Sequence, residues 1–152
     1  MVRSQYLENH LDTAGLKLAI QRTTKFLRAK KKDFDAIAFR GMSGALVAPA
    51  VSANLGKNLL MIRKEQSHSE MNVEGFIGNP QRYVIIDDFI SSGDTCYTII
   101  REVKKFDKDN TCVGIALYNN AYRDRKILDI SDADTDEQNL YVPCWPTDME
   151  DV

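Results

Sequence analysis

Hydrophobic residues in this chain follow two patterns, short unbroken runs and repeats at helical spacing. A short apolar run bounded by polar residues predicts a buried strand, and apolar residues at i, i+3 and i+4 predict an amphipathic helix. The apolar runs predict strands at 35–40, 58–63, 82–87, 111–118 and 140–145. The helical spacing predicts helices at about 12–31, 43–56 and 93–106.

Local signals refine two of these segments. Ser43 is the predicted N-cap of the second helix and Gly56 its stop, because serine favours the first position and glycine adopts the left-handed conformation that ends a helix. The segment 64–80 is polar and has no clear period, so it predicts a long loop with room for a short hairpin. Loops of this length inside compact domains are usually functional or disordered.

The predicted strands and helices alternate along the chain, which is typical of α/β proteins. The 152 residues are expected to form one domain, 1–152. We therefore predict an open, mostly parallel twisted sheet with flanking helices. In such sheets ligands bind beyond the carboxyl ends of the strands. The chemistry is accordingly expected just after Phe39, Arg63, Ile86 and Tyr118.

Composition and charge narrow the function classes. Twenty basic and 22 acidic residues give a formal net charge of -2, which argues against a general attraction to nucleic acid or to an anionic membrane. The three cysteines are widely spaced and form no zinc motif, as expected for a reducing compartment. No signal peptide and no apolar run of membrane-spanning length is seen, so we expect a cytoplasmic protein.

One segment carries most of the predicted chemistry. Asp87 and Asp88 follow an apolar strand, and the loop 91–95 then leads into a helix. Backbone N–H groups, hydroxyls and a helix N-terminus form a cradle suited to a phosphate, and Gly93 allows the backbone to approach it closely. Paired carboxylates accept hydrogen bonds from vicinal hydroxyls or hold magnesium.

The string VIIDDFISSGDT, 84–95, closely resembles the signature with which type I phosphoribosyltransferases bind 5-phosphoribosyl 1-pyrophosphate (PRPP). Phe89 is bulkier than the residue usual at its place. FRGMSG, 39–44, resembles the family's pyrophosphate loop, in which a strained and sometimes cis peptide would fall at Arg40–Gly41. IRKEQSHSEMNVEG, 62–75, matches the place of the family's mobile catalytic loop. The resemblance spans roughly residues 35–120, and it implies a small hood built from chain ends near 1–30 and 120–152.

The resemblance also implies the roles of particular residues. It implies transfer of the 5-phosphoribosyl group from PRPP to a nucleobase nitrogen, with Mg²⁺ held by Asp87 and Asp88. The implied catalytic residues are Asp87, Asp88, Lys64, Arg40 and His68. The implied PRPP-binding residues are Arg40, Gly41, Lys64, Asp87, Asp88, Ser91, Ser92, Gly93, Asp94 and Thr95. Family members commonly form homodimers, and we expect one here. The loop 64–78 is expected to be mobile and to exclude water when closed.

The acceptor base is open between two classes. Ser91 stands where enzymes for 6-oxopurines usually carry an acid, and no lysine follows Tyr118 before Lys126, which argues against hypoxanthine and guanine. The RKE segment and His68 resemble the loop of orotate enzymes, although a second lysine usual there is missing. Base contacts are expected from Tyr118, Asn119 and Trp145. Trp145 reads either as a stacking partner or as a residue packed in the core or at a dimer interface. We favour orotate, with a purine as the alternative.

Other classes of protein share parts of this pattern. A PRPP-responsive regulator that binds nucleic acid without catalysis fits the fold, and the basic end of the first helix, 22–32, keeps it open. The acidic net charge and the retained Lys64 favour the enzyme. A PRPP synthase would be longer and would need an ATP site that nothing here resembles. A structural protein that lost catalysis is argued against by the intact signature.

Overall fold

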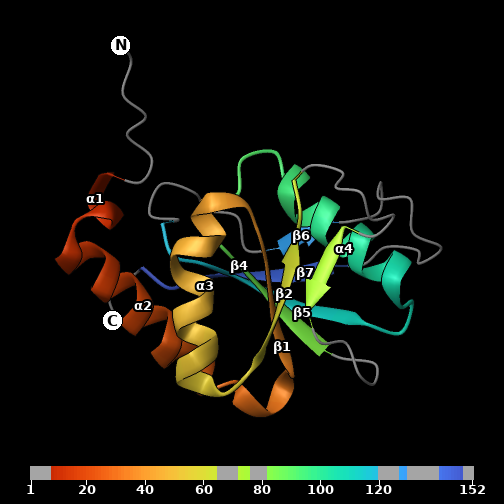
Figure 1. Cartoon of the computed structure of the whole chain (residues 1–152), viewed down its shortest axis with the longest axis horizontal. Helices are drawn as coiled ribbons and strands as arrows, with labels where there is room; N and C mark the ends of the chain where they lie inside the picture. The colour runs from red at the N-terminus through yellow and green to blue at the C-terminus, as the bar shows by residue number, and fades with distance from the viewer. Residues whose placement is uncertain (1–7, 65–71, 76–81, 120–126, 130–140, 149–152) are drawn as a thin grey trace.

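A computed structural model describes residues 8–64, 72–75, 82–119, 127–129 and 141–148 (Figure 1). The helices are α1 (Glu8–Leu11), α2 (Thr13–Arg28), the 3-10 helix η1 (Lys31–Asp33), α3 (Gly41–Leu55) and α4 (Asp94–Phe106). The strands are β1 (Ala36–Arg40), β2 (Asn58–Ile62), β3 (Val73–Gly75), β4 (Arg82–Asp87), β5 (Thr111–Leu117), β6 (Ile127–Asp129) and β7 (Tyr141–Pro146). Among these described helices, none is long and apolar enough to cross a bilayer.

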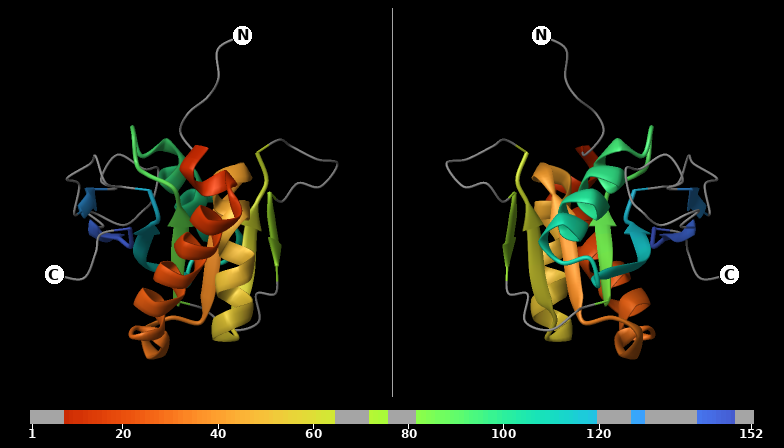
Figure 2. Two further views of the ribbon diagram at one scale, coloured as in Figure 1. Left: turned by 90° about the vertical axis from the view of Figure 1, so that its left-hand side faces the viewer. Right: turned by 90° about the vertical axis from the view of Figure 1, so that its right-hand side faces the viewer.

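The described strands form one sheet in the order β3-β2-β1-β4-β5-β7-β6. The five central strands pair in parallel, and β3 and β6 add antiparallel edges. The predicted open, mostly parallel sheet is therefore confirmed. Because the central strands run in one direction, their carboxyl ends meet at one edge of the sheet, the upper edge in Figure 2. The sequence left room for a short hairpin in the predicted loop 64–80. In the structure the short strand β3 lies there and pairs antiparallel with β2.

Helices cover both faces of the sheet, with α2 and α3 on one face and α4 on the other (Figure 2). The central strand β4 shows why its apolar run is continuous. Tyr83 and Ile85 pack into the cluster with α4, whereas Val84 and Ile86 pack into the cluster with α2 and α3. Successive side chains of a strand point to opposite faces, so a strand covered on both sides needs no polar alternation. This double burial holds the end of β4, where the acid pair begins, in a fixed position.

Helix α3 starts earlier than predicted. It begins at Gly41, directly after β1, and Arg40 occupies the N-cap position without a side-chain cap hydrogen bond. The prediction of Ser43 as N-cap was therefore wrong, because the turn at Gly41 lets the strand pass into the helix at once. The Ser43 hydroxyl instead donates a hydrogen bond to Asp87, 2.9 Å away. The predicted stop at Gly56 is confirmed, since this residue adopts the left-handed conformation with φ of 65°.

The two ends of the described chain pack against each other. The hydroxyls of Thr23 on α2 and Thr147 after β7 lie 3.0 Å apart in a buried hydrogen bond. The Arg22 guanidinium, on the preceding residue of α2, donates to the backbone oxygen of Asp148 at 3.4 Å. These contacts join segments more than 120 residues apart. They place α2 beside the end of β7, whereas the hood built from both chain ends stays a prediction.

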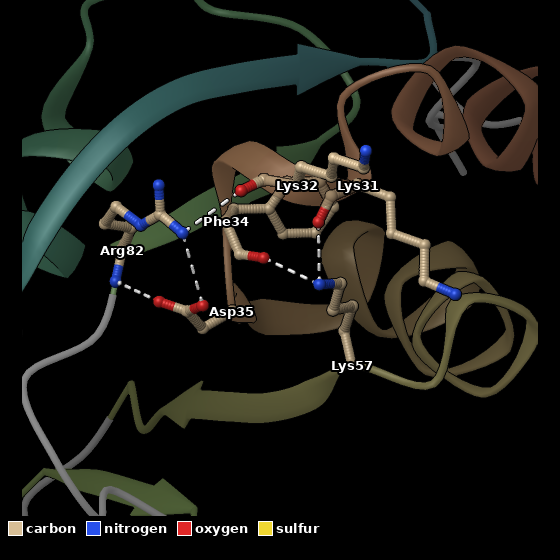
Figure 3. A network of polar contacts seen from close by, with 6 residues as sticks. All are labelled: Lys31, Lys32, Phe34, Asp35, Lys57 and Arg82. Carbon is tan, nitrogen blue, oxygen red and sulfur yellow. Dashed lines mark hydrogen bonds and ion pairs between the residues drawn. The ribbon is translucent and has the colours of Figure 1, made fainter.

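A polar network closes the opposite edge of the sheet, where the strands begin (Figure 3). The Arg82 side chain forms an ion pair with Asp35 at 3.5 Å, and the Arg82 backbone N–H donates to the same carboxylate at 3.0 Å. These bonds hold the pKa of Asp35 below its ordinary value. The Lys57 ammonium donates to the backbone oxygens of Lys31 and Phe34 at 2.8 and 2.7 Å. The network ties the starts of β1, β2 and β4 to η1.

Lys57→Met is expected to lower the free energy of unfolding by about 1–3 kcal/mol, because it leaves two backbone carbonyls without their charged donor. It also removes an ammonium that lies 5.0 Å from the centre of the Phe34 ring. Urea unfolding of the purified variant measures the effect. Lys31→Met is the control, because the Lys31 side chain is exposed, and it should change stability by less than about 0.5 kcal/mol. Equal losses of unfolding free energy in both variants would show that the Lys57 hydrogen bonds do not stabilise the fold measurably.

Candidate functional site

A cavity of about 190 Å³ opens at the carboxyl edge of the sheet. Its lining comes from three places along the chain: the junction of β1 and α3, Lys64 two residues after the end of β2, and the segment from the end of β4 into α4. The lining residues that were predicted from the sequence are Arg40, Lys64, Asp87, Asp88, Ser91, Ser92, Gly93, Asp94 and Thr95. The structure therefore brings together both predicted cations, both acids and the whole predicted phosphate loop.

The acid pair lies at the end of β4 in a largely buried position. Asp87 is only 5% exposed, and its Oδ1 accepts hydrogen bonds from the Ser43 hydroxyl and from the Asp88 backbone N–H, both at 2.9 Å. Asp88 in turn accepts from the Phe89 N–H at 2.8 Å. Burial, together with the negative charge of Asp88, raises the pKa of Asp87 to about 7. The two neighbouring carboxylates therefore resist being ionised together. A bound cation or hydroxyl donors would favour their charged form.

The chain immediately after β5 is fastened to the acid pair. The backbone N–H groups of Tyr118 and Asn119 donate to the backbone oxygens of Asp87 and Asp88, at 3.1 and 2.8 Å. The Tyr118 hydroxyl donates to the backbone oxygen of Ser43 at 2.6 Å. Burial and the two nearby carboxylates raise the pKa of Tyr118, so this hydroxyl keeps its proton. Two residues predicted to contact the base therefore sit beside the acids in a fixed position.

The basic side of the cavity is formed by Arg40 and Lys64. The Arg40 Nε is buried and has no hydrogen-bond partner among the described residues. Gly41 has a φ of 81°, and a Cβ placed on it would lie 2.6 Å from Cε of Lys64. The glycine thus leaves room for the lysine side chain to lie across the start of α3. The Arg40–Gly41 peptide is trans, so the expectation of a cis bond there was wrong.

The predicted phosphate cradle is the turn that begins α4. Gly93 is the N-cap with a φ of 93°, a conformation that favours glycine. The Asp94 backbone N–H, which we expected to face a phosphate, donates to the Ser92 hydroxyl at 3.2 Å. The side chain of Asp94 is exposed, which leaves room for a phosphate to approach the backbone rather than the carboxylate. The thirteen residues of α4 provide the helix N-terminus that attracts an anion.

Two predicted residues lie elsewhere. Trp145 does not line this cavity. It also does not line a second cavity, of about 250 Å³, between the N-terminal helices and the ends of β5 and β7. It packs beside Phe26 with ring centres 5.6 Å apart, and a Cβ placed on Gly114 would lie 2.1 Å from its Cη2, so its indole covers the glycine. This position favours the core reading of Trp145 over base stacking. His68 and most of the predicted loop, 65–71 and 76–81, lie outside the described residues.

Sequence reasoning missed the role of Ser43. The sequence predicts this serine as a helix cap, whereas in the structure its hydroxyl donates to the buried carboxylate of Asp87. The available signal was its place just beyond the carboxyl end of β1, next to β4 in the sheet. Since parallel neighbours end at the same edge, a hydroxyl there lies within reach of the neighbouring strand's acids.

The residues present fit a magnesium ion that is shared with a phosphate ligand. Among the described residues, no group of three or more acids, histidines or cysteines surrounds a common point. Mg²⁺, however, usually binds through one or two carboxylates together with water and substrate phosphates rather than in a full protein cage. Asp87 and Asp88 supply such a pair. Burial, together with the negative charge of Asp88, raises the pKa of Asp87, and a cation bound there would favour the ionised form.

Comparison with known proteins finds curated relatives that match about half of the chain. No family model matches the chain. An adenine phosphoribosyltransferase of Bifidobacterium animalis is 29% identical over 98 residues, which cover 54% of this chain and 51% of the relative. The transcriptional regulator GfcR of Methanocaldococcus jannaschii is 31% identical over 87 residues, covering 52% of this chain and 41% of the regulator. The chain therefore spans about half the length of the curated relatives it matches.

Solved structures extend the likeness over nearly the whole chain. The adenine phosphoribosyltransferase of Saccharomyces cerevisiae superposes with a TM-score of 0.68 at 14% identity, covering 97% of this chain and 86% of that one. The orotate phosphoribosyltransferase of Francisella tularensis superposes with a TM-score of 0.60 at 15% identity, covering 90% of this chain and 67% of the other. At these identities the likeness shows the fold. The chain has the open α/β fold of the type I phosphoribosyltransferases, and the resemblance predicted from its sequence is confirmed.

Proposed function

We propose that this chain transfers the 5-phosphoribosyl group of PRPP to a nitrogen of a nucleobase and releases pyrophosphate. The observation that carries this proposal is the cavity of about 190 Å³ at the end of β4. Two cations, two acids and a helix N-terminus converge there, although they come from three separate parts of the chain. Each of these groups matches one part of PRPP: its pyrophosphate, its ribose hydroxyls or its 5-phosphate.

The backbone and hydroxyls of Ser91–Thr95 would hold the 5-phosphate at the start of α4. The carboxylates of Asp87 and Asp88 would accept hydrogen bonds from the two ribose hydroxyls. Arg40 and Lys64 would bind the pyrophosphate, and the unpartnered Nε of Arg40 is a donor in place for it. The arrangement fixes the ribose between two anion sites, so positioning is the first contribution to catalysis.

Negative charge develops on the pyrophosphate as the bond to the anomeric carbon breaks. Arg40, Lys64 and the backbone at Gly41 would stabilise that charge as it forms. Bound Mg²⁺ would supply further neutralisation of the departing phosphates. A catalytic role for His68 and for the loop 64–78 stays part of the proposal.

The acceptor base is a finer question. The matched proteins include both adenine and orotate phosphoribosyltransferases, so they support the reaction without selecting a base. The loop segment RKE favours orotate as the acceptor base, and a purine is the alternative. A homodimer and a cytoplasmic location also stay predictions, the first of which light scattering would test.

A regulator is the second candidate, because one relative of similar identity is a transcriptional regulator. A regulator with this fold would bind PRPP in the same cavity and would respond by changing its affinity for nucleic acid. Salt-dependent binding of DNA or RNA that changes on addition of PRPP would support it. The net charge of -2 favours the enzyme.

The reaction is tested by measuring pyrophosphate release from PRPP and Mg²⁺ with orotate, uracil, adenine, hypoxanthine, guanine, xanthine and nicotinate in turn. We expect release with one base, together with the matching nucleotide. Asp88→Asn should lower turnover at least about tenfold without unfolding the chain, because it removes a carboxylate that holds the ribose and the metal. No release with any base, in protein that binds PRPP, would favour the regulator. Near-normal turnover in the variant would remove Asp88 from the mechanism.

A further inference from the structure

The short edge strand β6 supports the turn that begins α4. Leu128, the middle residue of β6, is only 2% exposed and belongs to the buried cluster on the α4 side of the sheet. A Cβ placed on Gly93 would lie 3.0 Å from Cδ1 of this leucine. The candidate phosphate turn is therefore packed against a strand that comes much later in the sequence.

Tyr97 contacts the same turn from within α4. It lies one helical turn after Gly93, and its backbone N–H donates to the Gly93 backbone oxygen at 2.9 Å. Its ring approaches the glycine as closely as Leu128 does, because a Cβ placed on Gly93 would also lie 3.0 Å from Cε2 of Tyr97. The bare Cα of Gly93 is thus packed against both the Tyr97 ring and the Leu128 side chain, and a larger residue would disturb both contacts.

A hydrogen bond ties Tyr97 to the strand. The Tyr97 hydroxyl donates to the backbone oxygen of Asp129, 32 positions further along the chain. Asp129 directly follows Leu128 in β6, which pairs antiparallel with β7, and β7 in turn pairs with β5. The start of α4 is therefore fastened to the edge of the sheet through the Tyr97 side chain, in addition to the hydrogen bonds within the helix.

The position of this turn matters for binding a phosphate. A helix N-terminus holds an anion through backbone N–H groups that point at it, so their direction decides the affinity. The side chains of Ser91, Ser92 and Asp94 are exposed, whereas Gly93 is buried. The packing around the glycine therefore fixes a turn whose other side chains make little contact with the core. Groups that are held in place before a ligand arrives bind it more tightly, because less freedom is lost on binding.

We infer that Tyr97 is a positioning residue for the 5-phosphate: its ring and hydroxyl hold the Gly93 turn against β6, so that the backbone N–H groups of the loop 91–95 face the ligand. Tyr97 is not among the described residues that line the cavity, so it acts through the loop and not by touching the phosphate. This role rests on the proposed function, because it assumes that the loop binds the 5-phosphate of PRPP. Equilibrium binding tests it separately from turnover.

The test uses Tyr97→Phe, which removes the hydroxyl and keeps the ring. Calorimetry titrates ribose 5-phosphate and, separately, pyrophosphate with Mg²⁺ into the full chain. The variant should weaken ribose 5-phosphate binding at least about fivefold, because the turn is no longer tied to β6. Pyrophosphate binding should stay within about twofold, since Arg40 and Lys64 make no use of this bond. Tyr141→Phe is the matched control and should change neither affinity, because Tyr141 is 60% exposed and pairs with Asp129 in the sheet.

Three results would overturn the inference. One is a wild-type chain that does not bind ribose 5-phosphate. Another is ribose 5-phosphate affinity that Tyr97→Phe leaves unchanged, even if the chain releases pyrophosphate from PRPP. The third is an equal loss of affinity for ribose 5-phosphate and for pyrophosphate, which would make Tyr97 a support of the whole fold. The proposed reaction fails differently: ribose 5-phosphate then binds with the predicted dependence on Tyr97, and no base yields pyrophosphate from PRPP.

Discussion

Asp87→Asn is expected to lower the rate of phosphoribosyl transfer by about 100-fold, because it removes a buried charge at the reacting ribose and half of the magnesium pair. The substitution keeps the shape of the side chain. The amide oxygen still accepts from the Ser43 hydroxyl and from the Asp88 N–H, the two bonds that the carboxylate makes. The loss therefore measures the charge of Asp87 rather than a change of structure.

The same variant should be more stable than the wild type when no ligand is bound. Burial and the Asp88 charge raise the pKa of Asp87 from 3.8 to about 7, so ionised Asp87 destabilises the folded state. The folded chain holds this proton more tightly than the unfolded chain, so wild-type stability falls as pH rises from about 4 to about 7. Asparagine carries no charge at any of these pH values. The gain from Asp87→Asn should be about 1–3 kcal/mol at pH 8 and should fade as pH falls toward 4.

Thermal unfolding at pH 8 and at pH 4.5, with turnover measured alongside, tests both expectations. Asp109→Asn is the control, because Asp109 is an exposed carboxylate between α4 and β5. It should change neither turnover nor thermal stability. A variant that loses activity and also loses stability at pH 8 would show that the carboxylate holds the fold together. In that case the activity loss would carry no information about the ribose.

Arg40→Met is expected to weaken PRPP binding by about 100-fold, because it removes a bidentate donor for the pyrophosphate while keeping an unbranched apolar stem. The substitution should not lower the stability of the folded state. The Arg40 Nε is already buried without a hydrogen bond among the described residues, so the substitution removes an unpaired donor. We expect the free energy of unfolding to stay the same or to rise slightly.

Equilibrium titration with PRPP and Mg²⁺ measures the first effect and urea unfolding the second. Arg101→Met on α4 is the matched control, because this side chain is exposed and its contact with Glu102, at 4.0 Å, is weak. If Arg40→Met binds PRPP normally, the pyrophosphate must lie elsewhere in the cavity. If instead it unfolds the chain, the Arg40 side chain is required for folding, and the binding loss would not report on the pyrophosphate.

Asp87 and Arg40 illustrate the same principle. Each holds polar or charged atoms in a buried position that folding alone does not favour. Sites that must bind charge commonly cost stability, and substitutions that relieve the cost remove the function. The pairing of lower activity with equal or higher stability is therefore a sharper test of the site than activity alone.

The sequence by itself determined the central elements of this protein. Strand β4 was predictable because it is buried on both faces, so its apolar run is unbroken and local. The end of α3 at Gly56 and the span of α4 follow from equally local signals. The loop 91–95 was also identifiable as a candidate phosphate cradle, because its polar groups lie in consecutive residues. The short edge strands β3 and β6 were not placed, since three residues carry too little periodicity.

Only the tertiary structure decided which distant residues share a site. Ser43 and Asp87 are 44 positions apart, and their hydrogen bond depends on β1 lying next to β4 in the sheet. Trp145 read equally well as a base contact or a core residue until its packing over Gly114 was known. The cavity between the N-terminal helices and the ends of β5 and β7 is lined by both His10 and Asp148, which no local pattern connects. Strand order and the meeting of the chain ends result from the packing of the whole chain, whereas the patterns in a sequence report each segment's own burial.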